Sequence, residues 1–283
     1  MTKQTLDRYR LSFTLLAVYC VLVAAVTVIL FPIFWMASSS LKPAPELFAR
    51  NLTMLPVAWT LENYRNVWEG TSFPIYFWNS FKVAALSTLL TVLISVYAAY
   101  AIARIRFRGR GAYGILLLVT QMFPHILLVN PLFIIIQRVG LLNTHAALIV
   151  AYTAFSLPFT IWMLRGFFEA IPQELEEAAA IDGASQITTF HKVILPLAGP
   201  GLAAVTMFGF IRGWNEVLFA LVFLQSRDLF TLPIGLASFQ EEYTFRWDLI
   251  MAGSGIITLP ILFFFLLMQR FIVQGLLGGA VKG

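Results

Sequence analysis

Apolar residues along this chain gather in six long runs, which shorter polar stretches separate. The runs cover residues 11–36, 81–103, 112–136, 144–164, 197–219 and 249–271. A helix needs roughly 20 consecutive, mostly apolar residues to cross the hydrocarbon core of a bilayer. Each run approaches or exceeds that length, so the pattern predicts six transmembrane helices in an all-α, polytopic membrane protein.

Composition agrees with this interpretation, because 59% of the 283 residues are hydrophobic and only 12% are charged. A soluble fold of this length needs a more highly charged surface. The first run is too long for the apolar part of a signal peptide, although the small residues Ala37 and Ser38 follow it. We therefore interpret it as an uncleaved span.

The distribution of basic residues predicts the orientation in the membrane. The short connection 104–110 reads RIRFRGR and carries four arginines, and short loops rich in Lys and Arg stay on the cytoplasmic side. An even number of spans then places both termini in the cytoplasm. The net charge of +5 follows from this topology, so no nucleic-acid partner is needed to explain it.

The sequence contains none of the usual motifs for nucleotide hydrolysis or metal binding. No lysine follows the glycine pattern of a phosphate-binding loop. The histidines, His125, His145 and His191, fall in three different segments without a second ligand at metal-binding spacing. Cys20 is the single cysteine. We therefore predict a chain that is not an enzyme and holds no cofactor or metal of its own.

One polar segment, residues 176–196, stands between two apolar runs and reads EEAAAIDGASQITTFHKVILP. Acidic residues in its first turns favour a helix N-terminus, Gly183 permits a sharp turn, and Ser185 can cap a second short helix. A helix lying on the lipid surface is the alternative, but such helices have basic polar faces and bulky apolar ones. This segment is acidic with an alanine face, which favours docking on a soluble protein.

The segment resembles the EAA loop of permease subunits of bacterial ABC importers. The residues that carry this resemblance are Glu177, Ala178, Ala179, Gly183, Ile194, Leu195 and Pro196. Residues 214–216 (WNE), the outer-loop string TLPIGLASF and the ending GLLGGAVKG are similar to carbohydrate importers, closest to the second permease subunit of maltose-type systems. The resemblance extends over nearly the whole chain from about residue 30.

The resemblance implies a type I ABC importer permease fold in a bacterial or archaeal inner membrane. It implies a heterodimer with a homologous permease, two ATP-binding cassette subunits that bind ATP and Mg, and an extracytoplasmic sugar-binding protein. The expected solute is maltose, maltodextrin, trehalose or a related glycoside. The expected parts are an N-terminal helix with its outer loop (1–79), a five-helix core with the coupling loop at 172–196 (80–274) and a tail (275–283).

Polar residues inside the predicted spans are candidates for the solute pathway, because such groups usually face the interior of a helical bundle. The candidates are Arg212, Asn215, Glu216 and Ser254. Arg212 and Glu216 are four residues apart on the fifth predicted span, so they can pair on one helical face. The alternative is a structural ion pair, and for Ser254 it is close packing between helices.

Two further regions are predicted to contact partner proteins. Phe239, Glu241 and Tyr243 lie in a long outer loop that would meet the binding protein, and the ending that contains Gly279 and Lys282 would meet the ATP-binding subunits. The rival hypothesis is a self-contained channel or secondary transporter. Such a protein needs its own ion-coupling carboxylates at membrane depth, and only Glu216 is available.

Overall fold

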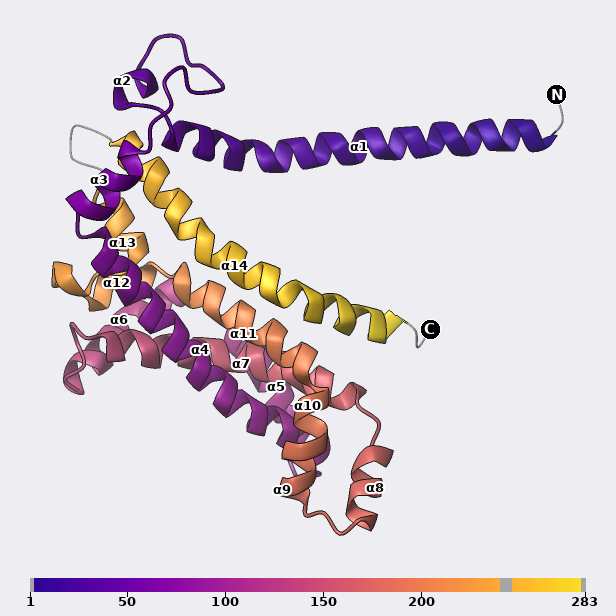
Figure 1. The fold of residues 1–283 in the computed structure, drawn as a ribbon. Helices are drawn as coiled ribbons and strands as arrows, with labels where there is room; N and C mark the ends of the chain where they lie inside the picture. The colour runs from indigo at the N-terminus through magenta and orange to yellow at the C-terminus, as the bar shows by residue number, and fades with distance from the viewer. Residues whose placement is uncertain (1–2, 240–245, 281–283) are drawn as a thin grey trace. The chain divides into compact units, whose positions relative to one another are not determined.

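The computed structural model describes the backbone of residues 3–239 and 246–280 and the side chains of residues 15–239 and 246–269. Over these residues the regular elements are all helices, which confirms the predicted all-α class (Figure 1). The chain divides into two compact units. One contains Met1–Thr71 and Phe239–Ile256, and the other contains Ser72–Ser238 and Ile257–Gly283.

The first unit is built around the long helix α1 (Lys3–Ser40). It also contains α2 (Ala44–Leu47), α3 (Glu62–Gly70) and the first turns of α14 (Trp247–Ala280). The candidate membrane span of α1 is Leu15–Ser40, and none of its most apolar window is buried. The helix therefore presents apolar side chains all round, as expected for a segment that lies in lipid or against another subunit.

Polar side chains tie the connection after α1 to α3. The Asn63 side-chain amide donates to the backbone oxygens of Ser40 (2.9 Å) and Lys42 (2.7 Å). The Lys42 ammonium is buried, donates to the Thr53 carbonyl at 2.5 Å and lies 4.9 Å from the centre of the Trp35 ring. Since an ammonium group is costly to bury without partners, these contacts fix the path of the loop.

The second unit is a bundle in which α4 packs along both α7 and α11. Figure 1 shows α8 and α9 together at one end of this bundle. Its helices are α4 (Phe73–Arg104), α5 (Arg110–Gln121), α6 (His125–Arg138), α7 (His145–Ala170), α8 (Glu174–Ile181), α9 (Gln186–Thr189), the π-helix η1 (Phe190–Ile194), α10 (Leu195–Leu197), α11 (Gly199–Trp214), α12 (Leu218–Phe223), the 3-10 helix η2 (Arg227–Leu229), α13 (Leu232–Ala237) and the rest of α14.

Four helices of the described chain are long and apolar enough to cross a membrane alone, and two bent pairs bring the total to six if each pair is one crossing. The run 112–136 is one of these pairs, since α5 and α6 meet at 96°. Pro124 lies directly before α6. Proline lacks a backbone N–H and restricts the residue before it, so a continuous helix ends there. The expectation of one uninterrupted helix is therefore wrong for this run.

The fifth run is interrupted as well. The helical stretch Gln186–Leu197 meets α11 at 73°, and Gly199 and Pro200 begin α11. At its other end, α11 stops at Trp214, and α12 begins only at Leu218. The predicted helix over 197–219 is consequently two helices, with three non-helical residues between them.

Buried apolar side chains form two clusters in the second unit. One cluster joins α4, α7, η1 and α11 near the α8–α9 end and includes Tyr100, Phe168, Phe190 and Ile194. The other joins α4, α6, α7, α12 and α13 and includes Phe219 and Phe223. The two clusters hold the helices on either side of the breaks, so the broken spans remain packed.

Gly235 of α13 is required where α13 crosses α4. A Cβ atom at Gly235 would overlap the Tyr76 ring of α4. We expect Gly235→Ala to lower the free energy of unfolding by about 1–3 kcal/mol, the usual cost of overpacking. Thermal unfolding in detergent, followed by tryptophan fluorescence, measures this loss.

The matched control is Gly166→Ala in α7, where a Cβ atom would have no heavy atom within 4 Å. That change should be neutral or stabilise the helix by roughly 0.5–1 kcal/mol, because alanine orders the helix backbone. Equal melting temperatures for the two variants would contradict the packing argument.

Candidate functional site

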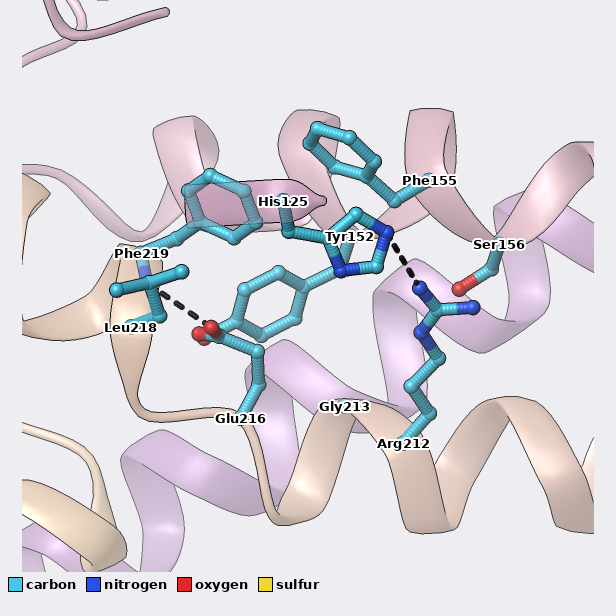
Figure 2. Close-up of a pocket in the computed structure, with 9 residues that line it drawn as sticks. All are labelled: His125, Tyr152, Phe155, Ser156, Arg212, Gly213, Glu216, Leu218 and Phe219. Atoms are coloured by element: carbon cyan, nitrogen blue, oxygen red, sulfur yellow. Dashed lines mark hydrogen bonds between the residues drawn. The ribbon is translucent and has the colours of Figure 1, made fainter. Parts of the chain in front are cut away.

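A pocket in the second unit lies where both broken spans come together with α7. Its volume is about 120 Å³. Figure 2 shows the lining residues, which come from α6, α7, α11, α12 and the stretch between the last two: His125, Tyr152, Phe155, Ser156, Arg212, Gly213, Glu216, Leu218 and Phe219. We call this the Arg212 pocket. Of its polar residues, Glu216 lies in the break after α11, His125 begins α6, and the others lie on α7 and α11.

Glu216 lies in the break between α11 and α12 and holds α12 in place. Its carboxylate accepts the backbone N–H groups of Phe219 (2.9 Å) and Ala220 (3.3 Å), which would otherwise lack helical partners. The buried Tyr152 hydroxyl donates to the same carboxylate at 2.5 Å. Glu216 therefore joins α12 to α7 by three hydrogen bonds.

Arg212 faces the other helix break. Its Nη2 lies 3.2 Å from Nε2 of His125, the first residue of α6. A guanidinium group can only donate, so His125 Nε2 accepts this bond. In Figure 2 the Ser156 hydroxyl points toward the same guanidinium group. The pocket thus offers guanidinium, imidazole, hydroxyl and carboxylate groups beside the stacked rings of Phe155 and Phe219, whose centres are 4.9 Å apart.

The structure corrects the expected pairing of Arg212 with Glu216. Because α11 ends at Trp214, the two residues do not lie one turn apart on a helix. The ion pairs within 4.0 Å in the described part of the chain do not include this pair. Instead, Arg212 bonds His125, and Glu216 bonds Tyr152 and α12.

The other two predicted pathway residues lie outside the Arg212 pocket. Asn215 is exposed, and its side-chain amide donates at 2.9 Å to the Ile211 carbonyl, which also accepts the Asn215 backbone N–H. Ser254 is in the part of α14 that belongs to the first unit. Sequence reasoning missed Tyr152 and Ser156, which lie one helical turn apart on α7. For His125 the sequence did offer a signal: it follows Pro124 directly, and a proline inside an apolar run indicates a possible helix break.

The predicted pair of short helices at 172–196 is confirmed, and we call these residues the docking segment after the role that the sequence predicts for them. Helix α8 begins at Glu174, and Gly183 has a left-handed backbone with φ of 80°. The Ser185 hydroxyl accepts the Thr188 N–H at 3.3 Å and caps α9. The turn and the cap that the sequence predicted are therefore both present.

The two halves of the docking segment differ in burial. No residue of α8 is buried, and Ile181 at its end is 87% exposed. Glu177 and Ala178 are exposed, and Ala179 is half-buried. In the second half Ile194 is fully buried, Leu195 is half-buried and Pro196 is exposed. The first half is thus available to a partner, while the second is anchored in the bundle.

The predicted partner contacts are described only in part. Phe239 is buried in the first unit, and Glu241 and Tyr243 lie outside the described residues. Gly279 belongs to the helical backbone of α14, and Lys282 lies outside the described residues. Within the residues that the structure describes, no group of three His, Cys, Asp or Glu side chains could hold a metal ion.

Known proteins resemble this chain over most of its length. A family described as "Binding-protein-dependent transport system inner membrane component" matches residues 91–278. The inner membrane ABC transporter permease protein YcjP of Escherichia coli is 38% identical over 283 residues, which cover 99% of each chain. The trehalose/maltose transport system permease protein MalG of Thermococcus litoralis is 42% identical over 257 residues, 90% of this chain and 92% of that protein.

The fold is also similar to a solved structure. The crystal structure of a bacterial ABC transporter involved in the import of the acidic polysaccharide alginate has a chain that superposes with a TM-score of 0.76. The two chains are 23% identical, and the superposition covers 96% of this chain and 99% of that one. Both the Arg212 pocket and the docking segment lie inside the region that the family matches.

The hydrogen bonds of Glu216 predict its contribution to stability. Glu216→Ala removes the cap of α12 and leaves the buried Tyr152 hydroxyl unpaired, so we expect the free energy of unfolding to fall by about 1–3 kcal/mol. Tyr152→Phe removes only one of the three bonds and should cost less. Thermal unfolding of the two single variants and the double variant gives the coupling energy between the residues. Strictly additive effects would contradict the bond.

Proposed function

Because this chain belongs to the family of binding-protein-dependent transport system inner membrane components, we propose that it is a permease subunit of an ATP-driven sugar importer. It forms half of the translocation pathway and performs no covalent chemistry. The observation that carries the proposal is the docking segment: a short helix with no buried residue, a left-handed glycine and a capped second helix, all between membrane-spanning helices. Such a segment suits a groove on a soluble partner.

The proposed partners follow from the family and from the surfaces of the chain. The exposed α8 docks on an ATP-binding cassette subunit, and two such subunits bind the ATP and Mg that drive transport. A homologous permease completes the pathway, and the unburied apolar face of α1 is available to it or to lipid. An extracytoplasmic sugar-binding protein delivers the solute, in line with the description of the family.

The proposed solute is maltose, maltodextrin, trehalose or a related glycoside. The relative from Thermococcus litoralis is named for trehalose and maltose, which supports this class. Within the chain, Arg212 and Ser156 offer donors and acceptors beside aromatic rings, the groups that recognise sugar hydroxyls. Asn215 and Ser254 remain further candidates for the pathway.

The proposed orientation places both termini in the cytoplasm of a bacterial or archaeal cell. The support is the arginine-rich connection 104–110, which lies next to the docking segment through the Arg104–Glu176 ion pair. The loop that contains Phe239 is then extracytoplasmic and can meet the binding protein. The ending that contains Gly279 and Lys282 is on the side of the ATP-binding subunits.

A secondary transporter is disfavoured by the bonds of Glu216. Ion coupling needs a carboxylate that can bind and release a cation within the membrane. Glu216 instead caps α12 and accepts the Tyr152 hydroxyl. Its oxygens are therefore occupied by structural bonds.

Reconstitution of the complex in vesicles tests the proposal. The chain, its companion permease, the ATP-binding subunits and the binding protein are combined, and sugar uptake and ATP hydrolysis are measured across a panel of glycosides. We expect one glycoside class to stimulate hydrolysis and to enter only with ATP and the binding protein. Uptake by the chain alone, driven by a proton or sodium gradient, would contradict the proposal.

Substitution of Gly183 tests the docking role. A residue with a Cβ atom is strained at φ of 80°, by roughly 1–2 kcal/mol, so Gly183→Leu should disturb the turn between α8 and α9. We expect the complex to assemble, while the sugar transported per ATP hydrolysed falls severalfold. The direct measurement is uptake and hydrolysis in the same vesicles.

Gly183→Asn separates backbone strain from obstruction of the docking surface. Asparagine adopts the left-handed conformation more readily than leucine, so it should retain more coupling. Gly111→Ala is the control, because a Cβ atom there has nothing within 4 Å and Gly111 has no left-handed backbone. Full coupling in Gly183→Leu would remove the docking segment from the mechanism.

A further inference from the structure

The first half of the docking segment is connected to the membrane helices mainly by polar bonds. We propose that the ion pair between Arg104 and Glu176 is the link through which α8 moves α4, so that both are positioning residues for transport. The inference rests on the proposed function, because it concerns how a docked ATP-binding subunit acts on the helices. It adds a role for two residues that the sequence motif does not include.

The geometry places the Arg104 side chain at the junction of three helices. Arg104 is the last residue of α4, and its Nε lies 2.6 Å from Oε1 of Glu176 in α8. Its Nη2 donates to the carbonyl of Ile171, directly after α7, at 2.5 Å. A single guanidinium fork therefore holds the ends of α4 and α7 and the first turn of α8 together.

Both carboxylate oxygens of Glu176 accept hydrogen bonds from α4. While Oε1 accepts from Arg104, Oε2 accepts the Tyr100 hydroxyl at 3.3 Å, one turn earlier on α4. The exposed fractions of the Arg104 and Glu176 side chains are 6% and 21%. Because little water reaches the pair, the bond is weakly screened and strongly oriented.

Each charge also suits the helix that carries it. Arg104 lies at the C-terminus of α4, where the helix dipole favours a cation, and Glu176 lies in the first turn of α8, where it favours an anion. The neighbouring acidic residues Glu174 and Glu177 are exposed. Among the described ion pairs, Glu176 is the acidic residue of α8 that pairs with a membrane helix.

Apolar packing connects the second half of the docking segment, but not the first. Phe190 of η1 is buried, and its ring centre lies 4.5 Å from that of Tyr100 and 6.2 Å from that of Phe168. In contrast, α8 buries no residue. Glu176 therefore connects α8 directly to α4, through the ion pair with Arg104 and the bond from Tyr100. The contacts of α8 with α9 and η1 lead instead to a segment that is packed into the bundle.

The position of α4 explains how this movement would reach the solute pathway. Helix α4 packs against both α7 and α11. These two helices carry Tyr152 and Arg212 of the Arg212 pocket. A shift of the α4 terminus thus acts on the helices that line the pocket, without a flexible connection between them.

The experiment compares Glu176→Gln and Arg104→Lys with the wild-type complex in vesicles. Glutamine keeps the shape of Glu176 but loses its charge, and lysine keeps the charge of Arg104 but cannot bond Glu176 and Ile171 with one planar fork. We expect both complexes to assemble and to hydrolyse ATP, with the sugar transported per ATP reduced by about tenfold, within the range for residues that modulate coupling. An unchanged ratio would overturn the proposal.

The matched control is the ion pair between Arg65 and Glu69 of α3. Its Nε to Oε2 distance is 2.7 Å, and its side chains are 75% and 62% exposed. Glu69→Gln removes the same type of bond, and we expect the transport ratio to stay at the wild-type value. An equal loss in Glu69→Gln would show that the effect is not specific to the link, and would overturn the proposal.

A chemical bridge distinguishes a mechanical link from a purely structural contact. In a Cys20→Ser background, the double variant Arg104→Cys with Glu176→Cys should lose coupling. A short bifunctional maleimide that joins the two cysteines should restore most of it, since it reconnects α8 to α4. If the bridged complex does not recover its sugar transport per ATP, the proposed link is overturned. Loss of assembly in all of these variants would also overturn it, because the pair would then be needed only for the structure.

Sugar uptake by the wild-type complex in the same vesicles distinguishes a failure of this inference from a failure of the proposed function. Absence of ATP-driven sugar uptake in the wild type would refute the importer, and the link with it. Normal uptake in the wild type together with a normal transport ratio in Glu176→Gln and Arg104→Lys would refute the link alone.

Discussion

Backbone N–H and C=O groups in the hydrocarbon region must find hydrogen-bond partners within the protein, and this requirement governs where the helices of this chain can break. At the end of α11 the exposed backbone is satisfied by side chains. Asn215 donates to the Ile211 carbonyl, and Glu216 accepts two N–H groups of α12. Without Glu216, the break between α11 and α12 would leave the N–H groups of Phe219 and Ala220 without these partners.

The same requirement explains why Glu216 lies at the Arg212 pocket. Glu216 bonds the backbone of α12 at one break, and the same carboxylate accepts the Tyr152 hydroxyl inside the pocket. Arg212 and His125 come from two different breaks and bond each other at 3.2 Å. Secondary transporters commonly bind their solutes at helix breaks of this kind, which supports the Arg212 pocket as the proposed place for the solute.

The two halves of the docking segment are attached to the bundle in different ways, one by apolar packing and the other by polar bonds. Phe190 and Ile194 pack into a buried cluster with Tyr100 and Phe168, so η1 belongs to the bundle. Helix α8 has no such packing and is oriented by Glu176 and Arg104. Apolar contacts tolerate small shifts, whereas a charged, bonded pair specifies distance and direction. The exposed helix can therefore meet a partner while its orientation relative to α4 stays defined.

The sequence by itself determined the membrane class, the position of the apolar runs and the local design of the docking segment. These features depend on neighbouring residues: apolar length, an acidic first turn, Gly183 at a left-handed turn and Ser185 as a cap. Pro124 was a visible signal for a break, but an apolar run around it also fitted a continuous helix, so the 96° bend was not predicted.

Only the tertiary structure decided which polar residues meet. Arg104 and Glu176 are 72 residues apart, Tyr152 and Glu216 are 64 apart, and His125 and Arg212 are 87 apart. Periodicity predicts which side of a helix a residue occupies, but it does not contain the packing of that helix against distant ones. The pairing expected for Arg212 and Glu216 was wrong for this reason, since it assumed a continuous helix where capping of α12 is the more favourable arrangement. The fold decides these long-range pairs because each polar side chain bonds the partner that helix packing brings within reach.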